Sequence, residues 1–205
     1  MRRQPSIPLW LKLAYSLWFV VWVPVYYALV GPANFLWLCD VGNIVLLIAL
    51  WSESRALFSA TAVGVVLVQL LWCVDLLGRL TLGFHPIGGT EYMLDPAEPL
   101  VVRALSFYHL WVPILLLWAL YRLGFDRRAW RIQTLILWII LPLSYLQDPA
   151  LNLNWLWRPF GLEQTLMPPA VYMVLNLALY PLLLFVPSQW LLETWLRRRG
   201  RPIVS

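Results

Sequence analysis

The residues with the clearest capacity for chemistry are an aspartate and a histidine inside apolar stretches of the chain, Asp40 and His109. A carboxylate can orient an imidazole and raise its basicity, which suits general-base catalysis. Cys39 stands beside Asp40 as a candidate nucleophile, although a thiol in apolar surroundings is usually inert unless a base lowers its pKa. The sequence therefore predicts a catalytic group of His109, Asp40 and Cys39. A buried structural histidine and a packing cysteine are the alternative interpretations.

Other polar residues are predicted to line a pocket with this group. Asn43 follows Asp40 by three residues and shares its helix face. Asp75 and Arg79 have the i, i+4 spacing of an intrahelical ion pair, for which a structural role is the simplest interpretation. The predicted pocket residues are Asn43, Asp75, Arg79, His85, Arg103, Ser106, Asp148, Asn152 and Asn154.

Motifs for metals and nucleotides do not occur in the sequence. There is no paired-cysteine, H-x-x-x-H or E-x-x-H spacing, so we expect no metal site. A P-loop, a dinucleotide fingerprint and a G-x-S-x-G elbow are also missing, which excludes little because intramembrane enzymes often lack them. The sequence leaves any cofactor unknown.

The composition places these residues in a membrane protein. Of the 205 residues, 61% are hydrophobic and only 12% are charged, and the mean hydropathy is +0.72. Tryptophan, which occurs 14 times, favours membrane interfaces because its ring is apolar while its N–H seeks water. An unpaired charge in hydrocarbon is costly, so Asp40 and a protonated His109 should face the bundle interior or a water-filled cleft.

Hydropathy predicts an all-α polytopic bundle of six transmembrane helices in a single domain, residues 1–205. The first apolar stretch, which starts at Leu9, is too long for the apolar region of a typical signal peptide, so a retained span is expected. The predicted spans are residues 9–30, 35–51, 56–77, 101–121, 132–146 and 167–188.

Charge predicts the orientation of these spans. With the N-terminus in the cytoplasm, all but Arg79, Arg103 and Arg158 of the 15 Lys and Arg residues lie on the inner side. This bias requires an even number of spans and places both termini in the cytoplasm. The catalytic group then lies toward the outer leaflet. We expect a multi-pass protein of the cell membrane, in bacteria the inner membrane, whose basic pI reflects orientation and not nucleic-acid binding.

Proline and small residues indicate how the spans pack. Each of four prolines inside a predicted span frees the carbonyl four residues earlier, and Pro113 frees that of His109. The small-xxx-small spacing of Ala60 and Gly64 predicts close helix packing. Trp190 to Leu196, followed by three arginines, is typical of a helix end against anionic headgroups, for which a plain stop-transfer anchor is the favoured interpretation.

Two segments carry a resemblance: SFYHLWVPILLLWALYRLGFDRR (residues 106–128) and DPALNLNW (residues 148–155). They resemble a family of uncharacterised bacterial multi-span membrane proteins, a resemblance that covers most of the chain and implies no activity. A candidate nucleophile on the second span and a histidine on the fourth are also similar in layout to the androgen-induced-type intramembrane hydrolases, which cleave fatty acyl esters. That layout implies the histidine role for His109, whereas Cys39 or Asp40 stands where that family uses threonine.

Three functions fit these patterns. The first is an intramembrane enzyme acting on a lipid or other apolar substrate from the outer leaflet. The second is a non-catalytic subunit or hydrophobic-ligand-binding protein with a membrane protein partner. The third is a proton-coupled transporter, against which the inner halves of the spans carry almost no polar residues. Membrane lipids are expected contacts in every case.

Overall fold

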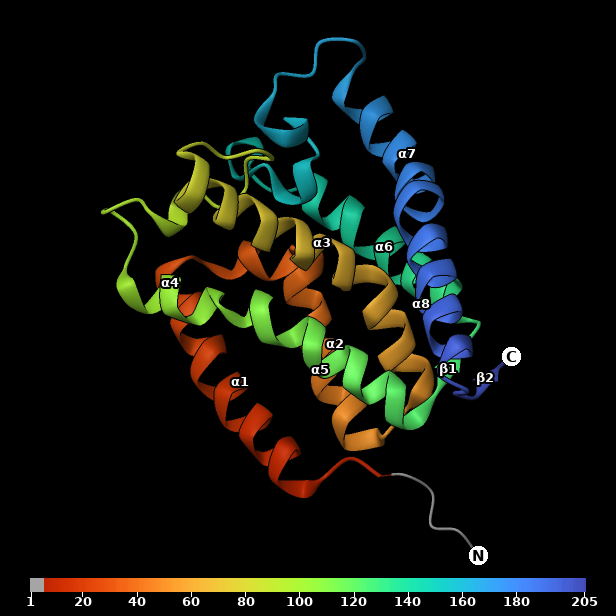
Figure 1. Cartoon of the computed structure of the whole chain (residues 1–205). Coiled ribbons are helices and arrows are strands. Elements are labelled where there is room, and N and C mark those ends of the chain that lie inside the picture. Colours follow the sequence, from red (N-terminus) through yellow and green to blue (C-terminus); the bar gives the residue numbers. More distant parts are fainter. Residues whose placement is uncertain (1–5) are drawn as a thin grey trace, which may run out of the picture.

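The computed structural model describes residues 6–205, which form a bundle of helices (Figure 1). Leu100–Leu123 is a single long apolar helix made of α4 and α5, and Pro169–Arg198 is another, in which a π-helical turn at Pro181–Phe185 joins α7 to α8. Six helical segments therefore result, at the positions predicted from hydropathy. The elements are α1 (Leu9–Leu29), α2 (Leu38–Ser52), α3 (Arg55–Leu82), α4 (Leu100–Ser106), α5 (Tyr108–Leu123), β1 (Phe125–Asp126), α6 (Ala129–Tyr145), α7 (Pro169–Tyr180), α8 (Val186–Arg198) and β2 (Ile203–Val204).

Four of the six segments are long and apolar enough to cross a membrane: α1, α3, α4–α5 and α7–α8. They contain between 21 and 30 residues, and about 20 residues suffice to cross the hydrocarbon core. α2 and α6 are apolar but shorter, with 15 and 17 residues. The fold is thus all-helical, with at least four helices of membrane-spanning length.

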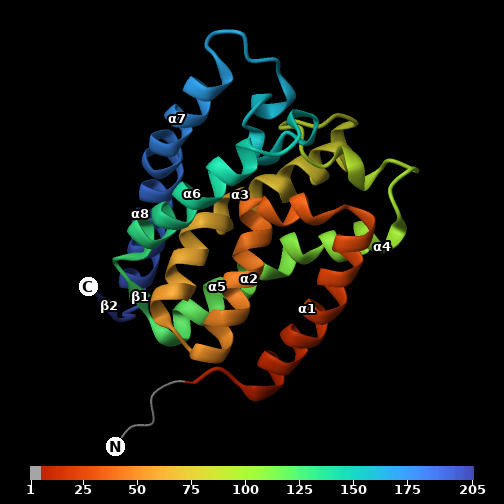
Figure 2. The ribbon, with the colours of Figure 1, turned by 180° about the vertical axis from the view of Figure 1, so that it is seen from behind.

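α3 occupies the centre of the bundle (Figures 1 and 2). It packs against α2, α5, α6 and α8, and its first half is almost fully buried. α1 and α7–α8 lie at the periphery and expose large aliphatic side chains such as Leu17 and Leu183. Exposed apolar surface on such helices is what a lipid-facing wall requires.

Close approach of α3 to its neighbours depends on glycine. A Cβ at Gly64 would overlap the side chain of Gln133 on α6, and a Cβ at Gly42 of α2 would overlap Val65 on α3. The predicted tight packing at Gly64 is therefore confirmed. Small residues at helix crossings allow the backbones to approach and gain dispersion contacts.

Two of the proline-freed carbonyls receive donors from neighbouring helices. The Cys73 thiol of α3 lies 3.5 Å from the carbonyl oxygen of His109, which Pro113 frees. The indole N–H of Trp138 on α6 donates to the carbonyl of Leu177, which Pro181 frees, at 3.0 Å. At these two prolines, a side chain of an adjacent helix takes the place of the missing backbone donor, and the resulting bond links the two helices.

The two ends of the bundle differ. At one end, β2 pairs in parallel with β1, so the tail of the chain is bound to the loop between α5 and α6. The start of α1 reaches the same end, where Lys12 and Glu53 form an ion pair with 2.6 Å between Nζ and Oε1. The opposite end carries the connections 30–37, 83–99 and 146–168 (Figure 1).

Candidate functional site

Asp40 lies in the first turn of α2, at the end of the bundle away from the chain termini, and is buried. Its Oδ1 accepts a 2.6 Å hydrogen bond from the Tyr108 hydroxyl, and its Oδ2 accepts a 2.8 Å bond from the Asn34 amide. Tyr108 is the first residue of α5, and Asn34 lies in the connection between α1 and α2. Both carboxylate oxygens are therefore occupied by donors from the protein.

His109 follows Tyr108 on α5 and is held by stacking and by one hydrogen bond. Its ring stacks on Trp72 of α3 at 4.6 Å and on Tyr108 at 4.0 Å between centroids. Its Nδ1 lies 2.8 Å from the backbone carbonyl of Ser106. A carbonyl can only accept, so Nδ1 carries the proton and the lone pair of a neutral ring resides on Nε2.

Asp40 does not orient His109, which corrects the sequence-based interpretation. In the part of the chain that the structure describes, no hydrogen bond joins the two side chains, and Tyr108 stands between them, bonded to Asp40 and stacked on His109. The backbone carbonyl of Ser106 takes the orienting role instead. Cys39 is half-buried and packs against the hydrophobic core.

More polar groups surround this cluster. The Tyr26 hydroxyl and Ser106 Oγ are 2.6 Å apart, and the Tyr15 hydroxyl donates to the backbone carbonyl of Asn43 at 2.9 Å. The side-chain amides of Asn43 and Gln69 are fully buried, and neither the Nδ2 of Asn43 nor either polar atom of Gln69 has a partner within residues 6–205. Unpaired buried amides are costly, so their partners are to be sought among water molecules or a ligand.

Asp75 does not pair with Arg79, contrary to the prediction from their spacing. Arg79 reaches the backbone carbonyl of Gly83. The Asp75 carboxylate instead binds the loop that follows α3. It accepts from the backbone N–H groups of Ile87, Gly88 and Thr90 at 2.7, 2.9 and 3.1 Å and from the Thr90 hydroxyl at 2.6 Å, and the Nδ1 of His85 lies at 3.2 Å.

The remaining predicted pocket residues hold the connections at the end of the bundle away from the chain termini. Asn154 docks the 146–168 connection onto α2: its Oδ1 accepts from the backbone N–H of Leu38, and its Nδ2 donates to the Leu36 carbonyl. Asn152 closes its own loop by accepting from the backbone N–H groups of residues 157 and 158. Asp148 caps a short turn through the N–H of Ala150, and Arg103 approaches the Met93 carbonyl at 3.5 Å.

Tyr108 is the main site residue that sequence reasoning missed. Nothing in its sequence context separates it from the other aromatic residues of the apolar segments. The nearest signal was its position directly before His109. Trp72 and Asn34 were missed for the same reason, since only the helix packing reveals what they contact.

The cluster is closed in this structure. Asp40, Tyr108 and Ser106 are almost inaccessible, and His109 is 6% exposed. Tyr92, from the loop that follows α3, is half-buried, and the burial of its hydroxyl raises the pKa of that group well above its usual range. Among the described residues, no three His, Cys, Asp or Glu side chains gather as they would around a metal ion.

No known protein family, curated protein or solved structure matches this chain.

Proposed function

We propose that the chain is a multi-pass protein of the bacterial inner membrane with six spans and both termini in the cytoplasm. The arginine-rich end of the bundle is then the inner one. α2 and α6 cross as short helices whose ends are extended by the 30–37 and 146–168 connections, as their close contacts with those connections suggest. The Asp40–Tyr108–His109 cluster then lies in the outer half of the bundle.

Within this frame, we propose an intramembrane enzyme that acts on a lipid or other apolar substrate. The observation that supports the proposal is the hydrogen bonding and orientation of the His109 ring. Its Nδ1 donates to the Ser106 carbonyl, which leaves Nε2 as the proton acceptor. Stacking on Trp72 and Tyr108 fixes the direction in which Nε2 points. A general base needs this combination of a set tautomer and a held ring.

The surroundings of His109 suit an apolar substrate. Its neighbours Phe107 and Leu110 on the same helix are exposed, as is Val74 on the facing helix α3. A lipid could therefore approach along the seam between α3 and α5. Cys39 is half-buried and packs against apolar residues, which do not activate a thiol, so attack by a water molecule activated at Nε2 is a simpler reaction than attack by its thiol. Asp40 is a positioning residue that holds Tyr108 against the imidazole.

The test is a comparison of lipid species by mass spectrometry after the purified protein is incubated with lipids from its host. Wild type should form a product that His109→Gln does not form. His85→Gln is the matched control, because that histidine lies in the loop bound by Asp75 and not in the cluster. If wild type and folded His109→Gln yield the same lipids, the enzyme proposal is wrong for these substrates.

A non-catalytic subunit or binding protein is the second candidate, and the closed packing of the cluster favours it. Asp40 has a hydrogen-bond donor on each carboxylate oxygen and is only 2% exposed. Such a network can fix helix positions without doing chemistry. Under this alternative, the protein purifies with a second chain or an apolar ligand, and replacing His109 changes its stability but no lipid.

A further inference from the structure

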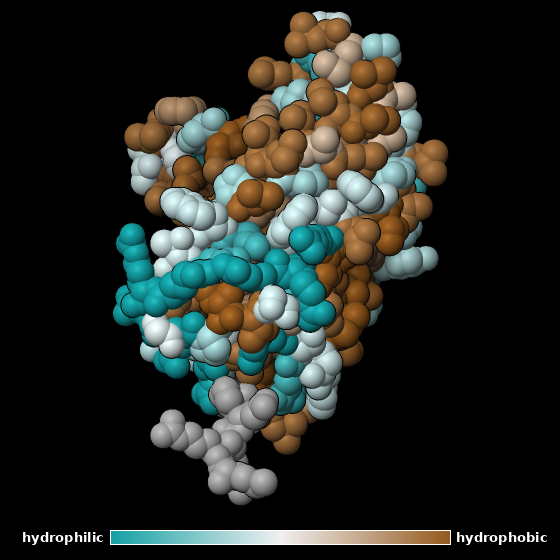
Figure 3. Space-filling model, turned by 90° about the vertical axis from the view of Figure 1, so that its right-hand side faces the viewer, coloured by the Kyte–Doolittle hydropathy of each residue, from teal (hydrophilic) through white to brown (hydrophobic). Residues whose placement is uncertain are grey.

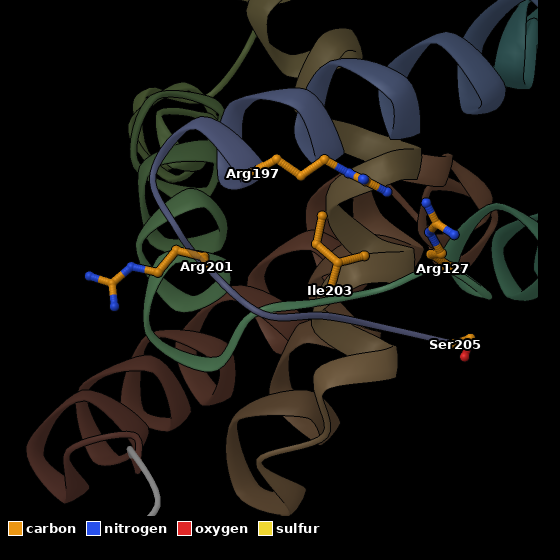
Figure 4. A pocket seen from close by; sticks show the side chains of 5 residues that line it. All are labelled: Arg127, Arg197, Arg201, Ile203 and Ser205. Carbon is orange, nitrogen blue, oxygen red and sulfur yellow. The ribbon is translucent and has the colours of Figure 1, made fainter.

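A basic hollow lies at the end of α8, far from the polar cluster (Figure 4). Its volume is about 330 Å³, and it is lined by Arg127, Arg197, Arg201, Ile203 and Ser205. The β1–β2 pairing forms its floor by joining the tail of the chain to the α5–α6 loop. Hydrophilic side chains gather around this part of the surface, whereas the face above it is mostly hydrophobic (Figure 3).

Glu193 holds two of the arginines together. Its Oε2 lies 3.3 Å from Nε of Arg127 and 3.3 Å from Nη2 of Arg197. Both arginine side chains are about half exposed, and one bond to Glu193 leaves each guanidinium with further N–H groups for another acceptor. One carboxylate cannot neutralise two guanidiniums, and the site remains positive. Arg201 also lines the hollow, but its guanidinium points away from Arg127 and Arg197 (Figure 4) and lies over Tyr121, 3.6 Å from the ring centroid.

A second hollow of about 180 Å³ is lined in part by Glu193, whose carboxylate pairs with Arg127 and Arg197 of the first hollow. Its other lining residues are Trp130, Val186, Gln189 and Trp190, and Trp190 is 66% exposed. Gln189 links the start of α6 to Glu193 on α8, because its Oε1 accepts from the Trp130 backbone N–H and its Nε2 donates to the Glu193 carboxylate. The second hollow therefore lies between α6 and α8, next to the basic one, and most of its lining surface is apolar.

We propose that the two hollows together bind one anionic phospholipid. The phosphate lies between Arg127 and Arg197, which offer forked N–H donors, and an acyl chain lies over Trp130, Val186 and Trp190. A phosphate on a diacyl lipid matches both the basic hollow and the mostly apolar hollow beside it, whereas a free phosphate would use only the first. The site depends on membrane location but not on any activity of His109.

The test is native mass spectrometry of the full-length protein in detergent with phosphatidylglycerol, and with phosphatidylcholine of the same acyl chains. Wild type should retain the anionic lipid preferentially. The double variant Arg127→Gln/Arg197→Gln should lose affinity for this lipid on the order of tenfold, because it removes two positive charges that attract the lipid phosphate. Arg198→Gln/Arg199→Gln is the matched control, with the same charge change on residues outside the hollow.

Further measurements distinguish a lipid phosphate from free inorganic phosphate, and a single variant covers the case in which the double variant does not fold. Trp190→Ala should weaken phosphatidylglycerol binding severalfold, and inorganic phosphate at millimolar concentration should not displace the lipid. Equal losses in the two arginine double variants, or displacement by inorganic phosphate, would overturn the proposal. If the first double variant does not fold, Arg197→Gln alone, which leaves Arg127 paired to Glu193, must still show a severalfold loss.

Discussion

At the scale of single residues, the buried carboxylate of Asp75 fixes a loop that lies ten to fifteen residues later in the chain. Its oxygens accept from three backbone N–H groups and one hydroxyl of the loop after α3. These donors replace the water that the carboxylate loses on burial. The loop in turn carries Tyr92, whose hydroxyl accepts from the indole of Trp72, the residue stacked on His109. Asp75 therefore supports the candidate site indirectly.

Asp75→Asn should destabilise the protein by about 2 kcal/mol, because an amide nitrogen would face N–H donors that now meet a carboxylate oxygen. Thermal unfolding in detergent measures the loss, and faster hydrogen exchange at residues 85–90 locates it. Arg79→Gln is the control and should cost less than about 0.5 kcal/mol, since this exposed side chain contacts only the Gly83 carbonyl. Equal losses in both variants would restore the ion-pair interpretation.

Asp126 predicts a dependence of stability on pH at the other end of the bundle. Hydrogen bonds from the Arg128 guanidinium to the Asp126 carboxylate lower the pKa of Asp126. The folded protein therefore binds this proton less readily than the unfolded chain does, so the carboxylate stabilises the fold above its unfolded pKa of about 3.9. That stabilisation is lost as the pH falls through the lower pKa of the folded state.

Asp126→Asn should consequently flatten the acid limb of the stability curve below about pH 4 while lowering stability near neutral pH. Unfolding temperatures measured between pH 7 and pH 3 test this. Hydrogen exchange at Phe125 and Arg127, whose N–H groups bond to the tail of the chain, reports the local effect. An unchanged acid limb in the variant would assign the loss of stability to other carboxyl groups.

The sequence could predict which polar residues lie at the same depth along the helix bundle, but not which of them are in contact. Depth follows from counting residues along a helix, so Asp40, Ser106 and His109 were placed together correctly. Partners depend on how helices rotate and how loops fold back. For this reason the true partners of Asp75, twelve to fifteen residues away in a loop, were not visible, whereas the nearby Arg79 was the wrong choice.

At the scale of elements, the helices were largely predictable because long apolar runs leave few alternatives in hydrocarbon. The first predicted span, residues 9–30, is α1 almost to the residue. The last predicted span ends at residue 188, and the helix continues through the helix end predicted at Trp190 to Leu196 as far as Arg198. Hydropathy marks where a helix leaves the membrane and not where it ends, and Pro181 does not stop the helix because a π-helical turn accommodates it.

The bond from Trp138 to the Leu177 carbonyl predicts an energetic coupling between α6 and α7. Trp138→Phe should cost about 1 kcal/mol, because it leaves the carbonyl freed by Pro181 without a donor. In a Pro181→Ala background the new backbone N–H can occupy that carbonyl, so the same substitution should cost much less. A double-mutant cycle of unfolding free energies measures the coupling.

Trp10→Phe is the control for that cycle. Trp10 is exposed on α1 and forms no side-chain hydrogen bond within the described residues, so its replacement should cost little in either background. Additive effects of Trp138→Phe and Pro181→Ala would mean that the indole bond does not compensate for the backbone N–H that Pro181 lacks.

At the scale of the whole molecule, the two ends of the bundle carry different kinds of interaction. The end with the C-terminus is basic and is bound together by ion pairs such as Lys12–Glu53 and Arg128–Asp126. The other end consists of long connections fixed mainly by hydrogen bonds, among them those of Asn154 and of the Asp75 carboxylate. In a membrane this asymmetry favours retention of the arginine-rich end in the cytoplasm, and with six crossings all three long connections lie outside.

Single cysteines test that topology. In a Cys39→Ser/Cys73→Ser background, we expect Asp95→Cys and Glu163→Cys to react with a membrane-impermeant maleimide in sealed right-side-out vesicles, because both positions are exposed in the connections at the end away from the chain termini. Ser205→Cys, exposed at the basic end, should react only after the vesicles are opened. Labelling of Ser205→Cys and Glu163→Cys from the same side would show that α7–α8 does not cross. Opposite labelling of Asp95→Cys and Glu163→Cys would identify α6, with its 17 residues, as a helix that enters the bundle without spanning the bilayer.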